Sequence, residues 1–357
     1  MRSLNLRYLQ ALRLSPRQAT SLKKIGEYQG KQALFARQTP EILESLRKVA
    51  QIESTESSNR IEGVVAPRAR VEALVRDAAV PEDRTEQEIA GYRDALELMH
   101  ESSEYLALSI HTIRQMHTMI NRYLPTDGGK WKSVDNRIVE KDPDGNITRV
   151  RFEPVSAAET AEAMETFVRN YDMANKEHEI EPLILIPLTI LDFLSIHPFS
   201  DGNGRISRLL TMLLLYHFDY QVGRYISLER IVEESKESYY EALRASSEKW
   251  HEGEHDPHPW IDYFWGVLLR AYGEFEERVG EVRTKKISKT EQIRLAVDRR
   301  VGPFAISDME RELPHISRDM IKLVLRDLKE EGLIEVRGKG RGAKWVRSAT
   351  APSGAEA

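Results

Sequence analysis

One segment, from Glu181 to Ile196, constrains the fold more than any other part of this chain. It is almost uniformly apolar, whereas a helix on a protein surface keeps a polar face. It is too short to cross a bilayer, because a membrane-spanning helix needs roughly 20 apolar residues, and Pro187 and Asp192 interrupt it. We therefore expect a helix at the centre of a helical bundle, and no membrane as a partner.

Composition supports a globular protein and excludes several chemistries. Of the 357 residues, 41% are hydrophobic and 31% are charged, which argues against wholesale disorder. The chain has no cysteine, so disulfides, thiolate metal sites and thiol nucleophiles are excluded. The N-terminal residues lack the continuous apolar stretch that drives secretion. We expect a soluble, cytoplasmic protein.

Apolar residues recur at three- and four-residue steps over most of the first two-thirds of the chain, a spacing that predicts helices. Helices are predicted at residues 85–100, 109–123, 156–175, 181–196, 205–218, 227–249 and 259–282, and one more begins at residue 39. Thr85 and Glu88 are placed as a capping box for the first of these. Between residues 131 and 152 the spacing changes to every second residue around a turn at 142–145, which predicts a β-hairpin.

The C-terminal part, residues 283–347, differs from the rest in charge and in pattern. It carries 17 Lys and Arg against 10 Asp and Glu, whereas the rest of the chain carries 35 against 47. Three short helices, at residues 290–300, 307–313 and 317–331, precede two strands, at 333–336 and 344–347, that flank the glycine-rich segment 338–342. This order resembles a winged-helix domain, whose third helix enters the major groove of duplex DNA. We expect duplex DNA or a protein as its partner, and a disordered tail at residues 348–357.

The most specific local pattern is the string His197-Pro198-Phe199-Ser200-Asp201-Gly202-Asn203-Gly204-Arg205-Ile206-Ser207-Arg208. The apolar helix delivers an imidazole to a turn, and a carboxylate follows four residues later. Two glycines around an asparagine let backbone N–H groups point inward where the next helix begins, so the turn can bind an anion. Two arginines three residues apart can both reach an oxyanion. With a carboxylate for a divalent cation, these groups predict a polyphosphate bound together with Mg²⁺.

This string resembles the complete motif of the Fic family, and the resemblance extends from about residue 58 to residue 282. We therefore expect a mainly α protein, a Fic helical bundle with a small β-hairpin flap followed by an α+β winged-helix domain. The expected parts are a helical N-terminal region at residues 1–105, a Fic core at 106–282 with the flap at 131–152 and the motif at 197–208, and the winged-helix domain at 283–347.

The resemblance implies the reaction of a protein adenylyltransferase. His197 would be the general base that takes the proton from a Ser, Thr or Tyr hydroxyl of a target protein. Asp201 would hold Mg²⁺ against the α- and β-phosphates of ATP. AMP would pass to the target and pyrophosphate would leave. The flap, residues 131–152, would align the target by pairing with its backbone.

The resemblance also implies which groups bind the phosphates. Gly202, Asn203 and Gly204 would form the anion hole, Arg205 would steady the phosphates, and Arg208 would bind the γ-phosphate. Fixed donors placed where negative charge accumulates are worth several kcal/mol in other enzymes.

A second resemblance lies upstream of the motif. Ser58-Asn59-Arg60-Ile61-Glu62-Gly63 is similar to the Ser/Thr-x-x-x-Glu-Gly/Asn inhibitory motif of Fic proteins that silence themselves. It implies that Ser58 and Glu62 belong to an inhibitory helix at about residues 55–63. Glu62 would pair with Arg208 and block the productive pose of the γ-phosphate.

Two further patterns are less specific. Tyr239 and Tyr240 lie where related proteins line the pocket for the nucleotide base, although aromatic pairs on a helix more often belong to a core. Residues 251–255 satisfy the zinc-protease pattern His-Glu-x-x-His. Gly253 weakens a helix there and Pro257 ends it, so a polar loop is favoured over a zinc site.

The leading interpretation is an ATP:protein adenylyltransferase that Glu62 inhibits, with ATP as substrate and Mg²⁺ as cofactor. Alternatives are removal of AMP by a water that Glu62 aligns, a preference for UTP or another nucleotide, and a DNA-binding regulator whose Fic fold senses nucleotide. The intact His197 disfavours a mere interaction scaffold. A target protein on the flap and a second copy of the chain are the expected protein partners.

Overall fold

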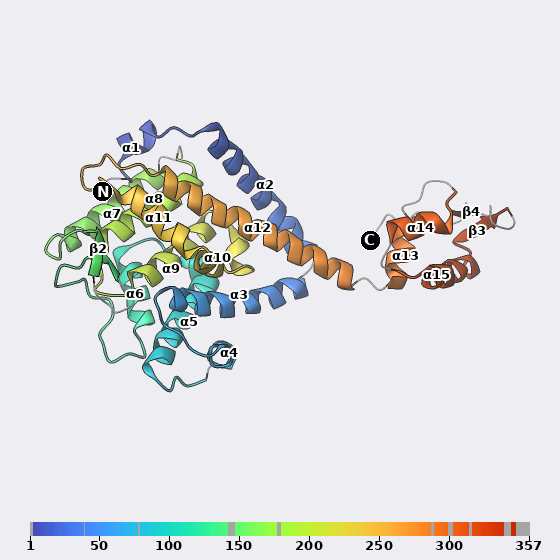
Figure 1. The fold of residues 1–357 in the computed structure, drawn as a ribbon, viewed down its shortest axis with the longest axis horizontal. Coiled ribbons are helices and arrows are strands. Elements are labelled where there is room, and N and C mark those ends of the chain that lie inside the picture. The colour runs from blue at the N-terminus through green and yellow to red at the C-terminus, as the bar shows by residue number, and fades with distance from the viewer. Residues whose placement is uncertain are drawn as a thin grey trace. The chain divides into compact units, whose positions relative to one another are not determined.

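The computed structural model describes residues 3–38, 40–77, 79–141, 147–176, 180–286, 289–298, 303–313, 316–338 and 344–347. The chain forms two compact units, Met1–Glu277 and Arg278–Ala357. The described fold is mainly helical with two small antiparallel hairpins, as predicted (Figure 1). The division and the predicted border at residue 282 both lie in helix α12 (His258–Lys286).

The helices of the first unit follow the apolar spacing of the sequence. They are α1 (Leu6–Ala11), α2 (Pro16–Gln38), α3 (Pro40–Ile61), α4 (Arg68–Arg76), α5 (Arg84–Ser102), α6 (Ile110–Ile120), α7 (Thr160–Lys176), α8 (Pro182–Ile196), α9 (Asn203–His217), α10 (Leu228–Glu234), α11 (Lys236–Ser247) and the first part of α12, with 3₁₀ turns at Ser103–Tyr105 and Gln221–Arg224. The predicted capping box of Thr85 and Glu88 is wrong. Asp83 caps α5 instead, and its carboxylate accepts a hydrogen bond from the Glu86 amide at 2.8 Å.

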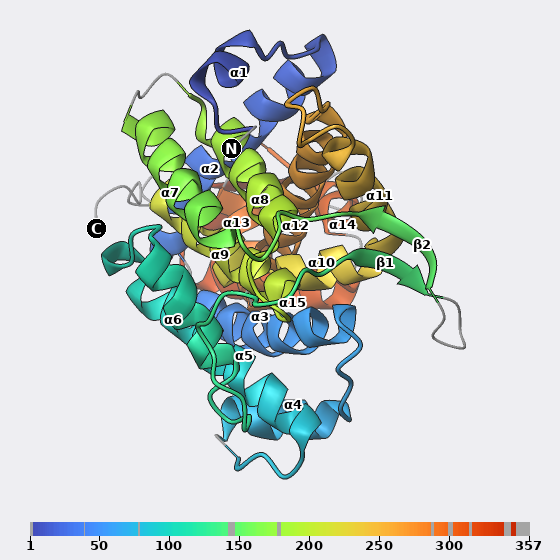
Figure 2. The same cartoon turned by 90° about the vertical axis from the view of Figure 1, so that its left-hand side faces the viewer.

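Helix α8 is the buried helix that the sequence predicts, because 13 of its 15 residues are buried. It packs against α7, α9 and α11, and Figure 2 shows α7 alongside it. Asp192 accepts hydrogen bonds from the Ser3 and Leu4 amides at 3.1 and 3.2 Å and from the Trp250 indole at 2.7 Å. These donors replace the water that the buried carboxylate loses. None of the described helices is both long and apolar enough to cross a membrane.

The predicted hairpin forms as β1 (Ile138–Lys141) and β2 (Ile147–Phe152), with Ile138 opposite Phe152. It projects from the side of the bundle in Figure 2. Residues 131–137 precede β1 in the chain and are not part of the sheet. The predicted turn at residues 142–145 lies outside the described residues.

The histidine-rich stretch after α11 is a loop, not a zinc-binding helix. The His251 ring stacks on Phe152, with ring centroids 5.4 Å apart. The Nε2 of His255 lies 2.9 Å from the hydroxyl of Ser3. Within the described ranges, no three His, Asp or Glu side chains gather in a way that could hold a metal ion. The two histidines therefore tie the loop to other parts of the fold.

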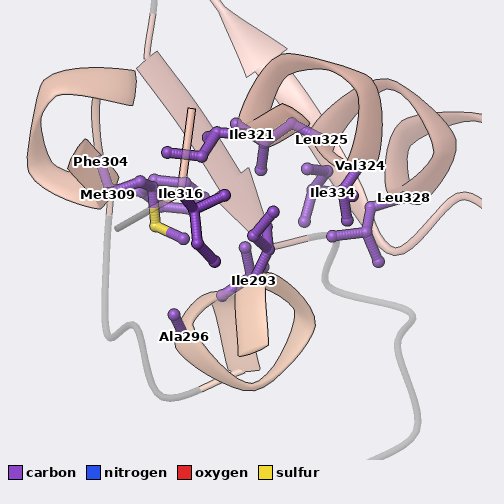
Figure 3. Packing of buried hydrophobic residues seen from close by; sticks show 11 residues of the cluster. Ile293, Ala296, Phe304, Met309, Ile316, Ile321, Val324, Leu325, Leu328 and Ile334 are labelled. Atoms are coloured by element: carbon purple, nitrogen blue, oxygen red, sulfur yellow. The ribbon is translucent and has the colours of Figure 1, made fainter. Parts of the chain in front are cut away.

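The second unit contains α13 (Lys289–Asp298), α14 (Ile306–Glu312) and α15 (Arg318–Glu330), followed by β3 (Ile334–Arg337) paired with β4 (Lys344–Arg347). Its buried core, drawn in Figure 3, includes Ile293, Phe304, Met309, Ile316, Ile321, Val324, Leu325, Leu328 and Ile334. The element order is the one predicted for a winged helix. Most of the expected wing, residues 339–343, and the tail at 348–357 lie outside the described residues.

Candidate active site

His197 stands at the end of α8 in a left-handed backbone conformation, with φ 52° and ψ 60°. Its Nδ1 lies 3.3 Å from the Leu194 carbonyl oxygen, which can only accept. Nδ1 therefore carries the proton and the lone pair is on Nε2. Burial, with the positive charge of Lys132 as a smaller cause, lowers the pKa of His197 to about 4. The imidazole is neutral at pH 7 and can accept a proton.

The turn after His197 is held together by the side chain of Asn203. Its Oδ1 accepts a hydrogen bond from the Phe199 amide at 2.9 Å, and its Nδ2 donates to the Phe199 carbonyl at 2.8 Å. The fully buried Phe199 ring stacks on His117 at 3.8 Å between centroids. The side chain of Asn203 thus braces the loop, and only its backbone amide remains for an anion.

The backbone between Asp201 and Gly204 forms a cradle above the start of α9. Gly202 has φ 80°, a conformation that favours glycine, and its amide donates to Oδ1 of Asp201 at 2.6 Å. Because α9 begins at Asn203, the amides of its first turn have no partner within the helix. A side chain on Gly204 would place its Cβ 2.1 Å from Oε1 of Glu62. The carboxylate of Glu62 therefore lies next to Gly204, beside the cradle.

Arg208 is buried and bonded to the inhibitory segment. Its Nε donates to the Ser58 hydroxyl at 2.8 Å, and its Nη2 donates to the Ser58 carbonyl at 2.9 Å and to Oε1 of Glu62 at 2.8 Å. Burial alone would lower the pKa of Arg208, but the Glu62 carboxylate, together with Tyr239 and Tyr92, outweighs burial and holds that pKa above its usual value. Its buried Nη1 has no hydrogen-bond partner among the described residues. Ser58, Glu62 and Arg208 are thus brought together.

Glu62 itself is less constrained than its partner. It follows the last residue of α3, and its side chain is 32% exposed, against 7% for Arg208. Gly63 takes a left-handed φ of 84°, which ends the helix. Lys236 of α11 donates to the Ile61 carbonyl at 2.7 Å and so holds the helix end next to the cradle.

Arg205 lies behind the cradle and does not line the cavity. Its Nη1 donates to Glu88 of α5 at 3.0 Å, and its Nη2 lies 3.7 Å from Oδ2 of Asp201. The Asp201 side chain is 86% exposed, whereas that of Arg205 is only 4% exposed. In this arrangement Arg205 is placed to orient the Asp201 carboxylate, and it is not placed to bind a phosphate in the cavity.

A cavity of about 1080 Å³ opens beside these groups. Its wall includes His197, Asp201, Arg208 and both tyrosines, Tyr239 and Tyr240. The tyrosine rings meet edge to face at 5.1 Å between centroids. The cavity is at the upper end of the roughly 300–1,000 Å³ usual for small-molecule sites, so it can accept a nucleotide-sized ligand.

Four residues of this site carry no sequence signal for the role that they have here. Glu88 pairs with Arg205, and His117 supports Phe199 and accepts the Gly129 amide at 2.8 Å. Lys132 and Asn136 contact the turn around His197. None of the four belongs to the motif at residues 197–208, and each is 63 to 117 positions from the residue of that motif that it contacts.

Comparison with known proteins finds relatives of this chain. Residues 107–215 match the family model described as Fic/DOC family, so this part of the chain is similar to that family. Members of that family typically transfer AMP or other nucleotide-derived groups to proteins, and generally use ATP and a divalent metal. A curated relative, a Fido domain-containing protein of Dictyostelium discoideum, is 28% identical over 91 residues. The match covers 26% of this chain and spans 59% of the relative's length.

Solved structures share the fold. A Fic family protein from Desulfovibrio desulfuricans G20 has a TM-score of 0.62 at 20% identity, with 96% of this chain and 99% of that chain covered. A Fic domain containing signaling protein from Bacteroides thetaiotaomicron has a TM-score of 0.59 at 19% identity, over 73% and 97%. A variant of Fic-1 from C. elegans with one substitution has a TM-score of 0.56 at 19% identity, over 73% of this chain and 72% of that chain.

Proposed function

We propose that this protein transfers AMP from ATP to a hydroxyl group of a target protein, and that Glu62 inhibits the transfer. One observation carries the proposal. The carboxylate of Glu62 lies over Gly204 and pairs with Arg208 at 2.8 Å, so a negatively charged group of the chain lies beside the anion cradle of the motif. A phosphate of ATP would need the same space next to Gly204 and the same guanidinium.

The chemistry follows from the neutral His197. Its Nε2 takes the proton of the target hydroxyl, and the oxygen attacks the α-phosphorus of ATP. The bond from that phosphorus to the β-phosphate oxygen breaks, AMP stays on the target, and pyrophosphate leaves. The amides at the start of α9 stabilise the negative charge that develops on the phosphate oxygens.

Asp201 is the residue that fits Mg²⁺. Its exposed carboxylate lines the cavity, and a single carboxylate suits a cation that takes its other ligands from substrate phosphates and water. The bound ion would offset negative charge on the triphosphate. Arg205, paired with Glu88, keeps the carboxylate oriented.

Inhibition has a simple electrostatic basis. While Glu62 occupies Arg208, a γ-phosphate would meet a carboxylate in place of a free cation. If the closed arrangement is favoured by about 2–3 kcal/mol, its loss raises activity roughly 30- to 150-fold. The partly exposed Glu62 can leave without unfolding α3.

The test is self-labelling with ATP radioactive at the α-phosphate, in the presence of Mg²⁺. Glu62→Gly should raise the label roughly 30- to 150-fold over the wild type, and the isosteric Glu62→Gln should raise it less. ATP labelled at the γ-phosphate should transfer nothing. Label from UTP or CTP above that from ATP would assign another nucleotide, and equal labelling of wild type and Glu62→Gly would end the inhibitory role.

The same site can run in reverse, with Glu62 aligning a water that removes AMP. The forward direction is preferred because Glu62 contacts Arg208 and the cradle directly. An AMP-modified target separates the two. Faster release of AMP by the wild type than by Glu62→Gly would favour removal.

We further propose that the target docks on β1–β2, where its backbone can pair with a strand of the hairpin. We also propose that the protein acts in the cytoplasm, since its cysteine-free composition fits a reducing compartment.

A second candidate function, binding of duplex DNA by the second unit, is favoured by one face of α15. The exposed residues Arg318, Lys322, Arg326 and Lys329 follow one another at four-, four- and three-residue steps, so they form a stripe along the helix. A row of cations suits the phosphates of a duplex.

A gel shift over a salt series tests this candidate. Lys322→Glu with Arg326→Glu should weaken binding and reduce the salt slope, whereas Arg311→Glu, exposed on α14 outside the stripe, should do so less. Absence of a shift at low salt would reject DNA as the partner.

A further inference from the structure

The turn that carries His197 is clamped by a segment outside the motif. The backbone amide of Lys132 donates to the Pro198 carbonyl at 2.9 Å, and its ammonium donates to the Ile196 carbonyl at 3.2 Å. Lys132 thus bonds the carbonyl on each side of His197. Asn136 continues the clamp, because its Nδ2 donates to the Phe199 carbonyl at 3.0 Å and its Oδ1 accepts from Lys132 at 2.8 Å.

These bonds meet a need that the helix end creates. The last carbonyls of α8 have no partner within the helix, and that end carries the negative pole of the helix dipole. His197 also has a backbone conformation that non-glycine residues adopt rarely and keep only when their surroundings enforce it. The ammonium of Lys132 donates to the carbonyl of Ile196, so it gives that carbonyl a partner, places a positive charge at the negative end of the helix, and helps to fix the backbone of His197.

The ammonium of Lys132 donates hydrogen bonds to neutral oxygens at this turn, and among the described residues it has no carboxylate partner. The residue is 3% exposed, and burial lowers its pKa to about 8. Among the described residues it forms no ion pair, and its hydrogen bonds go to Asn136 and Ile196. A buried lysine bonded to neutral oxygens keeps its charge at a cost, which a purely packing role would not require.

We propose that Lys132 is a positioning residue for His197, holding the imidazole toward the cavity by fixing the carbonyls on both sides of it, with Asn136 orienting the ammonium. The kinetic consequence rests on the proposed AMP transfer, whereas the effect on the His197 ring does not. Lys132 belongs to the chain that leads into β1, so the flap and the catalytic turn share this clamp.

The kinetic test uses Lys132→Met in the Glu62→Gly background. We expect kcat for self-labelling to fall about 10- to 100-fold because a small misplacement of a catalytic group has effects of this size. KM for ATP should stay within about twofold, since Lys132 does not line the cavity. Lys130→Met is the matched control, because Lys130 is 69% exposed and pairs with Asp127. Its kcat should stay that of the parent.

A second readout does not depend on AMP transfer. The ring signal of His197 in a histidine NMR spectrum, assigned by its loss in His197→Ala, should move in Lys132→Met and stay in place in Lys130→Met. An unmoved signal would overturn the proposal even if AMP transfer is correct, and a moved signal would uphold it even if no label is transferred. Should Lys132→Met fail to fold, Asn136→Ala carries the same two measurements. Equal losses of kcat and of ATP binding would reduce Lys132 to a structural role.

Discussion

The turn from His197 to Gly204 and the end of helix α3 meet at Arg208, yet they are built in opposite ways. In the turn, the buried Asn203 bonds both backbone groups of Phe199, and Lys132 bonds the carbonyls around His197. At the end of α3, the partly exposed Glu62 makes one ion pair next to a glycine.

Under the proposed function, this difference separates the residues that would carry out the transfer from the contact that would inhibit it. A geometry needed in every turnover is held by buried hydrogen bonds, each costly to leave unmade. A contact that has to be broken is left partly exposed, where water weakens an ion pair. Under the proposed function, Glu62 would be exchanged for a phosphate while the turn keeps its shape.

The largest expected effect removes the base. In the Glu62→Gly background, His197→Ala should lower self-labelling by about 10²- to 10⁴-fold, the usual contribution of general base catalysis. ATP binding, measured by calorimetry, should be retained because the cradle is unchanged. Labelling that persists in the double variant would remove His197 from the mechanism.

Next in size is the loss of the brace. Asn203→Ala leaves the amide of Phe199 without a partner and leaves its carbonyl only the bond from Asn136, so the free energy of unfolding should fall by about 1–3 kcal/mol. Urea unfolding followed by circular dichroism measures it. A loss below about 0.5 kcal/mol would show that the turn is as loosely held as Glu62.

The pH response of His197 tests its burial. NMR should find the imidazole neutral at pH 5 and protonated only as the pH falls through about 4, because burial disfavours the imidazolium. The unfolded chain binds this proton near pH 6.5, so stability should decline as the pH falls from 6.5 toward 4, by about 1.4 kcal/mol per unit for this group. His197→Gln should make that decline shallower. A His197 pKa near 6.5 would contradict the buried geometry.

The smallest effect is expected at the neighbour of Asn203. The added methyl of Gly204→Ala would meet the end of the flexible Glu62 side chain, which can move aside. Alanine also suits a helix better than glycine, so stability should stay within about 1 kcal/mol of the wild type. The same urea experiment compares the two variants. A loss as large as that of Asn203→Ala would mean that Glu62 is fixed as firmly as the turn.

Much of the fold could be predicted from the sequence because it depends on local patterns. The uniform apolarity of α8 indicated a buried helix, and the alternation around residues 138–152 indicated a hairpin. The capping box at Thr85 was wrong because Asp83, two residues earlier, offers a better-placed carboxylate. Capping depends on the helix start, which spacing places only within a few residues.

The same distinction between local patterns and long-range contacts applies to the functional site. The sequence by itself determined which residues are candidates for the proposed chemistry, since the motif from His197 to Arg208 is continuous and a short string determines its own turn. Only the tertiary structure decided that Glu62 lies on Gly204, that Arg205 pairs with Glu88, and that Lys132 clamps the catalytic turn. The reason is physical. Such contacts join residues 64 to 142 positions apart, and packing of whole helices, not local backbone preference, brings them together.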